Sequence, residues 1–326
     1  MNRFLSAIGV LVCFASIAVA AHPLHVAILT GDEEYRSEES MPMIGKMLQR
    51  DFGAHVTIGF SVDGNGHVDP DAVESMTGTE AIEDADVLVL FLRFRRPSEE
   101  AFGRILAHLK AGKPVVGFRT STHAFRFAED SPHVQWGFQD DPTFKHSFAG
   151  GDLTRELLGQ KWIIHHGHFS DGKNPLTDVS KTDVKHPILN GVEPFSAYSW
   201  LYHVQGGGDT IAGDPTILLQ GKSLRSEHEA EGNTDRYPLK NPVAWTKTHQ
   251  WGEKPGRVFM TTLGHPYDFR SPAMRRLAIQ GILWAAGRED LIPEDGANTE
   301  TVGNYEPNNS GFNNDFKPNM KPSDLF

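Results

Sequence analysis

Short apolar runs separated by polar, glycine-containing turns make up the first half of the chain. Between two of these runs, residues 98–111 place apolar side chains on one helical face, and Gly112 follows directly, as at a helix end. This strand–helix–strand alternation predicts a parallel α/β sheet, in which strands buried on both faces are continuously apolar. The strands predicted here are Leu24–Thr30, His55–Val62, Asp86–Phe94 and Pro114–Arg119.

The pattern fails from Ala128 to Gly159, where we expect a functional or disordered excursion. Regularity then returns and ends in a helix predicted for Ala273–Ala286, followed by Gly287. Residues 293–326 contain seven Asn, four Pro and few apolar residues, which predicts an extended arm over the domain or partial disorder. The later predicted strands are Lys161–His168, Thr216–Leu219, Val243–Thr246 and Val258–Thr262.

The N-terminus has the pattern of a secretory signal. Arg3 precedes an uncharged apolar run that ends in small residues at 18–20, typical of a cleavage site; a membrane anchor is the alternative. We therefore divide the chain into a signal peptide at 1–20, an α/β domain at 21–290 and an Asn/Pro-rich C-terminal arm at 291–326. The expected location is periplasmic or secreted, with no membrane span after cleavage.

Composition narrows the possible chemistry. The chain has 31 Lys+Arg against 42 Asp+Glu, a formal net charge of −11, which disfavours nucleic acid as a partner. Its single cysteine, Cys13, lies in the predicted signal peptide. The mature protein would then have no disulfide, no Cys-ligated zinc and no cysteine nucleophile.

Ligands bind beyond the carboxyl ends of the strands in open parallel sheets, so polar residues there are candidates. The first strand leads into an acidic loop in which Glu34, Tyr35 and Arg36 are the residues most suited to binding; a solvated turn is the alternative. The third strand ends at Arg93, whose guanidinium suits carboxylates or sugar oxygens, although it could equally form a surface ion pair.

The fourth strand leads into a turn, residues 119–123, of the kind that presents a nucleophile in hydrolase-like and amidotransferase-like folds. The turn has hydroxyl groups but neither a Cys nor the G-x-S-x-G pattern, so binding is the more plausible role. Walker, G-x-G-x-x-G and H-E-x-x-H motifs are absent from the sequence, and no nucleotide cofactor is indicated.

Histidines supply the remaining candidates. On a strand, His166 and His168 would share a face and could hold one metal ion; a hydrogen-bonded pair without an ion is the alternative. His265 follows the last predicted strand and could act as an acid or base. Tyr202 could face a sugar or pack in the core.

The order and spacing of several segments resemble the ThuA-like (trehalose utilisation) family, in particular exported members of planctomycete type. The resemblance implies a class I glutamine amidotransferase-like, flavodoxin-like fold with a doubly wound, mainly parallel sheet but without the amidotransferase cysteine. It also implies a role in sugar catabolism, in particular on 3-keto-glycosides, and in some members a divalent metal such as Zn or Mn. Many relatives have a His where this chain has Tyr35, so the resemblance does not extend a metal site to that position, although the His166/His168 pair could compensate. The segments are 31–39, VVGFRTSTHAF at 115–125, 162–168, HPILNGV at 186–192, NPVAWT at 241–246 and 256–287.

Three hypotheses follow. In the first, an exported enzyme moves the proton next to the carbonyl group of a keto-sugar, with His166 or His265 as base and Arg119 or a metal polarising the carbonyl oxygen. The others are a non-catalytic sugar-binding or scaffold domain and a metal-dependent hydrolase of a non-sugar substrate. The candidate residues are, for catalysis, His166, His265 and Arg119; for substrate binding, Glu34, Tyr35, Arg36, Arg93, Ser121, Thr122, His123 and Tyr202; for a metal, His166 and His168.

Overall fold

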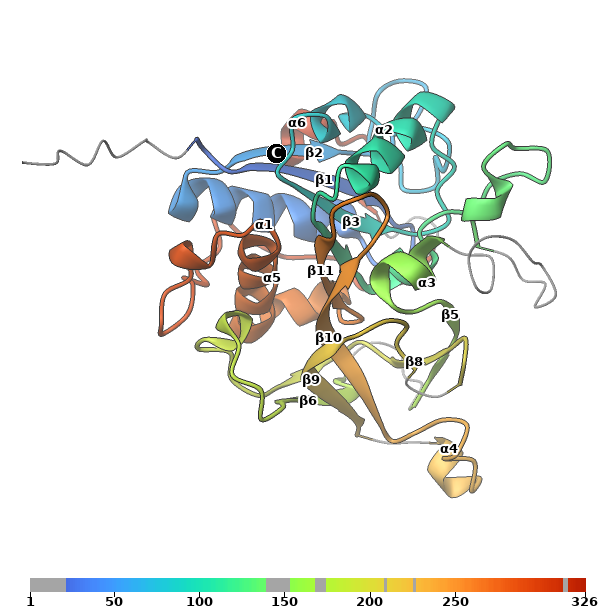
Figure 1. The fold of residues 1–326 in the computed structure, drawn as a ribbon, viewed down its shortest axis with the longest axis vertical. Helices are drawn as coiled ribbons and strands as arrows, with labels where there is room; N and C mark the ends of the chain where they lie inside the picture. Colours follow the sequence, from blue (N-terminus) through green and yellow to red (C-terminus); the bar gives the residue numbers. More distant parts are fainter. Residues whose placement is uncertain (1–21, 139–152, 168–173, 208–209, 225–226, 313–315) are drawn as a thin grey trace, which may run out of the picture.

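A nine-stranded sheet in the order β2-β1-β3-β4-β11-β10-β9-β6-β7 forms the centre of the protein (Figure 1). The structure is a computed structural model that describes residues 22–138, 153–167, 174–207, 210–224, 227–312 and 316–326. The predicted signal peptide at 1–20 and residues 139–152 of the predicted excursion therefore lie outside the described residues. Within them, no helix combines the length and apolar character needed to cross a bilayer.

One half of the sheet is parallel. Its order, β2-β1-β3-β4, is that of a flavodoxin-like fold, and β11 continues it in the same direction. The predicted α/β fold is thereby confirmed. The parallel strands are β1 (His25–Gly31), β2 (His55–Gly59), β3 (Val87–Leu92), β4 (Val115–Phe118) and β11 (Gly256–Thr261).

The other half is an antiparallel extension that the apolar pattern did not indicate, since a buried strand has the same composition in either direction. A register shift in β10 follows Pro242, which has no N–H to donate to the ladder. A separate antiparallel pair, β5 with β8, lies beside the main sheet. The strands are β10 (Lys240–His249), β9 (Thr216–Ser223), β6 (Thr177–Lys181), β7 (Phe195–Ala197), β5 (Trp162–His166) and β8 (Leu201–Val204).

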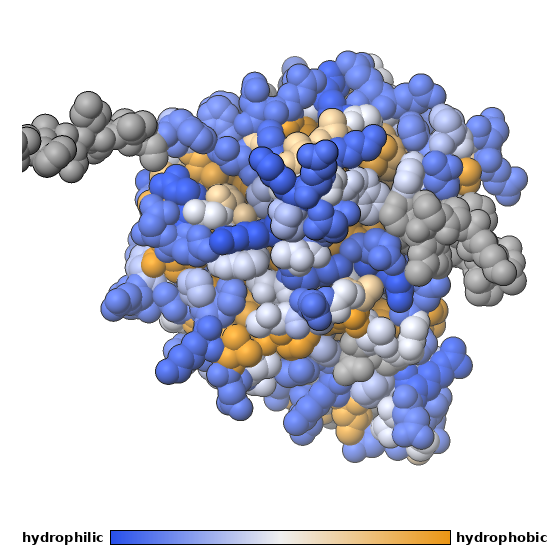
Figure 2. All heavy atoms as spheres, viewed as in Figure 1, coloured by the Kyte–Doolittle hydropathy of each residue, from blue (hydrophilic) through white to orange (hydrophobic). Residues whose placement is uncertain are grey.

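Helices cover both faces of the parallel half. Alternate side chains of β3 point to opposite faces, so that Val89 joins one apolar core and Leu90 the other. Figure 2 shows that the outer surface seen in the same view is mainly hydrophilic, with separate apolar patches. The first core contains α1 (Ser37–Phe52) and α5 (Pro272–Ala285), and the second α2 (Glu99–Lys110) and α3 (Leu153–Leu158). Two one-turn helices are α4 (Glu227–Ala230) and α6 (Pro322–Leu325).

The C-terminal segment (residues 291–326, described except for 313–315) crosses the molecule from α5 to the loop after β2. The Arg275 side chain donates to the Thr299 carbonyl at 2.7 Å, and the Tyr305 hydroxyl donates to the Pro266 carbonyl at 3.0 Å. Further along, the N–H of Val68 donates to the Met320 carbonyl at 2.7 Å. Between these contacts the segment passes the carboxyl ends of the parallel strands.

Candidate functional site

The carboxyl ends of β1, β3 and β4 all continue into residues with left-handed backbone conformations. Arg36, Phe94 and Arg119 have φ angles of 55°, 49° and 41°, values that residues other than glycine seldom adopt. Such a conformation costs about 1–3 kcal/mol and persists where the surrounding contacts impose it, often at functional sites. Three of them at one edge of the sheet mark this edge as the candidate site.

Arg119 occupies the strained position directly after β4 where related folds carry a nucleophile. Its Nη1 donates to the carbonyls of Trp200 (3.0 Å) and Thr262 (2.7 Å), and its Nη2 donates to the Tyr35 hydroxyl (3.0 Å). The guanidinium carbon lies 4.5 Å from the ring centroids of both Tyr35 and Tyr202. Burial alone would lower the pKa of Arg119, but the two phenols hold it above its ordinary value. Arg119 is therefore a fixed, permanently charged group packed against Tyr35 and Tyr202.

Glu34 and His165 meet next to Tyr35. The Tyr35 hydroxyl is 3.3 Å from His165 Nε2, and Glu34 Oε1 is 3.9 Å from the same nitrogen. Burial raises the pKa of Glu34 to about 7, against the opposing effect of Arg93. Burial, with the Arg119 charge, lowers the pKa of His165 to about 3. At neutral pH the imidazole is neutral, while the carboxyl group is poised between its two protonation states.

Arg93 lies on the other side of Glu34. Its Nε is 3.1 Å from Glu34 Oε2, and its Nη1 pairs with Glu33. The guanidinium carbon is also 4.7 Å from the Phe94 ring centroid and 4.9 Å from that of Phe312, which comes from the C-terminal segment. The expected strand-end arginine thus lies between acidic and aromatic groups.

Aromatic rings surround the imidazole of His165. Trp162 lies 5.4 Å away and Trp200 5.3 Å away between ring centroids, and Trp162 also packs against His123 at 4.7 Å with a tilted ring. Burial lowers the pKa of His123 well below its ordinary value. The buried hydroxyl of Tyr202 has no hydrogen-bond partner among the described atoms. A buried hydroxyl without a partner is costly, which favours a polar ligand here.

His265 lies next to the site and caps the N-terminus of the short helix Pro266–Arg270. Its Nδ1 accepts a hydrogen bond from the Tyr267 N–H at 3.0 Å, and its ring lies 6.2 Å from that of Tyr35. Burial, followed by the Arg119 charge, lowers the pKa of His265 to about 3. The ring is therefore neutral, and its Nδ1 is already engaged by the backbone.

The structure places His166 away from the strand ends. Successive strand residues point to opposite sides, and His165 is the one that faces Arg119. The His166 ring instead lies 5.6 Å from Tyr237 and 6.4 Å from His228. His168, its expected partner in a metal site, lies outside the described residues.

Three expected substrate-binding side chains are instead committed to the protein. Ser121 is fully buried and donates to the Leu90 carbonyl at 2.7 Å, and Thr122 is fully buried and donates to the Arg119 carbonyl at 3.3 Å. The buried Arg36 guanidinium donates to the carbonyls of Glu33 and Gly311. These hydrogen bonds fix the shape of the loops after β1 and β4.

A divalent metal does not fit the strand-end site. In the part of the chain that the structure describes, no group of three His, Cys, Asp or Glu side chains is arranged to hold an ion. The nearest donors, Glu34 and His165, are flanked by the guanidinium groups of Arg93 and Arg119, which oppose a second positive charge.

Sequence reasoning missed four site residues: His165, Trp162, Trp200 and Phe312. Strand periodicity showed that His165 and His166 point to opposite sides but gave no sign of which side faces the sheet edge. Phe312 lies in a segment without periodicity, far from the strands in sequence. Only tertiary contacts place it beside Arg93.

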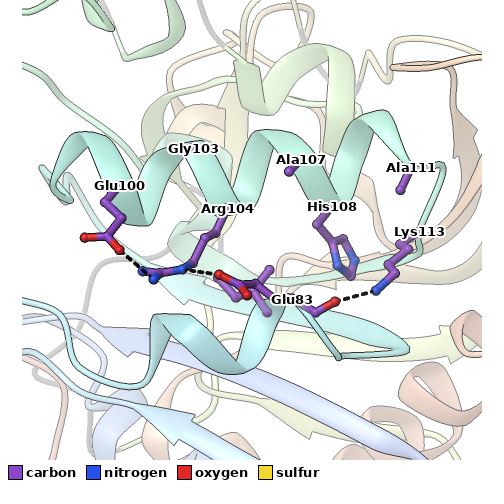
Figure 3. Close-up of a pocket in the computed structure, with 9 residues that line it drawn as sticks. Glu83, Glu100, Gly103, Arg104, Ala107, His108, Ala111 and Lys113 are labelled. Carbon is purple, nitrogen blue, oxygen red and sulfur yellow. Dashed lines mark hydrogen bonds and ion pairs between the residues drawn. The ribbon is translucent and has the colours of Figure 1, made fainter.

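A cavity of about 530 Å³ lies elsewhere, along α2 (Figure 3). There Arg104 reaches between two acids, with Nε 2.8 Å from Glu83 Oε1 and Nη2 2.7 Å from Glu100 Oε1, and Lys113 donates to the Glu83 carbonyl at 2.9 Å. Exposed ion pairs of this kind are common surface features. None of its lining residues comes from the strand-end loops, so we place the candidate site at the sheet edge.

Comparison with known proteins finds one family model and several solved structures that are similar to this chain. The model of the family described as "ThuA: Trehalose utilisation" matches residues 25–285, which include the ends of β1, β3 and β4. No curated protein matches the chain. Among solved structures, it is similar to a protein described as ThuA-like from Parabacteroides merdae ATCC 43184, with 16% identity, a TM-score of 0.48, and coverage of 81% of this chain and 90% of that one. A second such protein, from Bacteroides uniformis ATCC 8492, has 14% identity, a TM-score of 0.47, and coverage of 83% and 95%.

Proposed function

Because the chain belongs to the ThuA, or trehalose utilisation, family, we propose that it processes a keto-sugar or 3-keto-glycoside in sugar catabolism. The substrate is then a small neutral carbohydrate, in keeping with a net charge of −11. The proposal includes export to the periplasm or beyond it, directed by the apolar segment at residues 1–20.

The observation that supports this function is a carboxyl group with a pKa of about 7 beside a phenol–imidazole pair. Glu34 is the carboxyl group, and Tyr35 and His165 are the pair. A base works best when its pKa is near the working pH, and burial provides that for Glu34. Moving the proton next to a carbonyl group needs such a base together with a hydrogen-bond donor for the carbonyl oxygen.

The donor follows from the hydrogen-bond relay behind His165. Arg119 donates to the Tyr35 oxygen, so the Tyr35 hydroxyl proton is directed to His165 Nε2. The neutral imidazole then carries its proton on Nδ1, the ring nitrogen not used by Tyr35. We assign that N–H as the donor to the substrate's carbonyl oxygen. Arg119 is then a positioning residue, because it acts through Tyr35.

In the proposed step, the Glu34 carboxylate removes a proton from the carbon next to the carbonyl group. The C–H electron pair becomes the double bond of an enediolate, and the negative charge on oxygen is stabilised by the His165 N–H. Return of the proton to the former carbonyl carbon, with the hydroxyl proton passing to the other oxygen of the enediolate, completes an isomerisation to the neighbouring ketone. Where the next carbon bears a glycosidic oxygen, the electron pair instead expels that oxygen, which takes the proton from Glu34, and an unsaturated keto-sugar remains.

Glutamine amidotransfer is not supported by this site. The elbow position holds Arg119, and the hydroxyl groups that follow it are engaged: Thr120 donates to Asp32 and Ser121 to the Leu90 carbonyl. Acyl transfer needs a nucleophile free to attack. A non-catalytic sugar-binding protein is the remaining alternative, since the Tyr202 hydroxyl favours a polar ligand whether or not a reaction follows.

The test is turnover of 3-keto-trehalose and trehalose by the wild-type protein and by Glu34→Gln. We expect wild-type turnover of the keto-sugar and a loss of about 100-fold or more in kcat for Glu34→Gln, the range for a general base. Glu100→Gln, a change to an exposed acid on α2, is the matched control. Calorimetric binding of both sugars without turnover would favour the binding protein, and full activity of Glu34→Gln would overturn the assignment of the base.

A further inference from the structure

The C-terminal segment is anchored to the loop after β1, beside the candidate site. The Gly311 N–H donates to the Glu34 carbonyl at 2.8 Å, and the Asn308 N–H donates to Glu39 Oε2 at 3.1 Å. Arg36, held in its left-handed conformation, donates to the Gly311 carbonyl. Gly311 itself has a φ of 145°, a conformation that other residues rarely adopt. The segment is thus fixed to the loop that carries the proposed base.

These anchors place Phe312 beside the polar groups of the site. Its ring centroid is 4.9 Å from the guanidinium carbon of Arg93, the residue that pairs with Glu34. The Phe312 side chain nevertheless remains 50% exposed, the largest exposed fraction among the large hydrophobic residues that the structure describes. The ring contacts the Arg93 guanidinium, and about half of the residue's surface is open to solvent.

We propose that Phe312 is a specificity-determining residue that stacks on the apolar face of a sugar ring bound at Glu34 and His165. An aromatic ring held by a backbone anchor offers a flat apolar surface at low entropic cost, while the neighbouring Arg93 and Glu34 supply partners for sugar hydroxyls. The inference rests on the proposed function, since it takes the ligand to be a carbohydrate. It adds that residues outside the α/β domain complete the binding site.

The first test separates stacking from catalysis. With 3-keto-trehalose as substrate, Phe312→Ala should raise KM by about threefold to tenfold, the equivalent of one aromatic contact, with little change in kcat. Phe312→Trp should restore the wild-type KM. Val302→Ala is the matched control, because Val302 is an exposed apolar residue (38%) of the same segment.

The second test reports contact directly. The chain's single cysteine is Cys13, so Phe312→Cys in a Cys13→Ser background carries one thiol. Trehalose and 3-keto-trehalose should slow its reaction with a thiol reagent and should leave Val302→Cys unaffected. If the wild-type protein binds neither sugar, the proposed function and this inference both fall. If it turns over the keto-sugar while the Phe312 variants keep their KM and the thiol is unprotected, the role of Phe312 alone is overturned.

Discussion

Glu34 shows how one residue acquires its chemistry from its surroundings. The sequence placed it in an acidic loop, but a carboxyl group in water titrates far below neutrality. Burial raises the pKa of Glu34 from 4.5 to about 7, and Asp32 adds to the shift, while Arg93 and Arg119 oppose it. Two guanidinium groups thus keep a buried acid from becoming permanently protonated, and it can exchange a proton near physiological pH.

This environment predicts the pH profile. A base must be ionised to act, so kcat/KM of the free enzyme should rise with pH and level off above a pKa of about 7. Arg93→Ala removes a charge that lowers this pKa, so the rising limb should move to higher pH. Steady-state rates between pH 5 and 9 measure both effects. A flat profile in the wild-type protein would contradict the role of Glu34.

The orientation of β5 determines which of its two histidines faces the site. The sequence showed a strand with adjacent histidines, and the strand is present at Trp162–His166. Its orientation depends on pairing with β8 and on the packing of Trp162 against His123. Both are contacts between residues distant in sequence, so periodicity alone could not select His165 over His166.

The two neighbouring histidines give a matched pair of variants. His165→Ala should lower kcat by about 100-fold, because the proposed enediolate loses its hydrogen-bond donor. His166→Ala should stay within about threefold of wild type, since its ring faces Tyr237 rather than Glu34. Keto-sugar turnover by both proteins, after circular dichroism has shown that each is folded, measures the difference. The reverse order would return the catalytic role to His166.

The molecule as a whole combines parts that differ in how well sequence predicts them. The parallel strands and the helices near 98–111 and 273–286 were predictable because continuous apolar runs and helical spacing are local signals. The antiparallel half and the course of the C-terminal segment were not, since strand direction and long-range anchoring leave no local pattern. The candidate site draws on both parts, which explains why the sequence indicated Arg119 and Glu34 as candidates but not Phe312.

Gln280 of α5 connects the loop between β6 and β7 with the C-terminal segment. Its fully buried amide donates to the carbonyls of Ile188 (2.7 Å) and Asn190 (3.1 Å) and accepts from the Ala297 N–H (2.8 Å). Gln280→Met keeps the volume but leaves three buried backbone groups without partners. Since each costs about 1–3 kcal/mol, we expect a loss of about 3 kcal/mol or more in the free energy of unfolding, measured with urea.

A change at an exposed ion pair provides the comparison. Arg288→Ala removes the contact with Asp290 near the end of the same helix, and such pairs contribute about 0–1 kcal/mol. The two variants should therefore differ clearly in their urea midpoints, with similar slopes. Equal midpoints would mean that the C-terminal segment docks independently of Gln280. The anchoring of Phe312 at the site would then rest on the other contacts of the segment, among them those of Arg36 and Glu39.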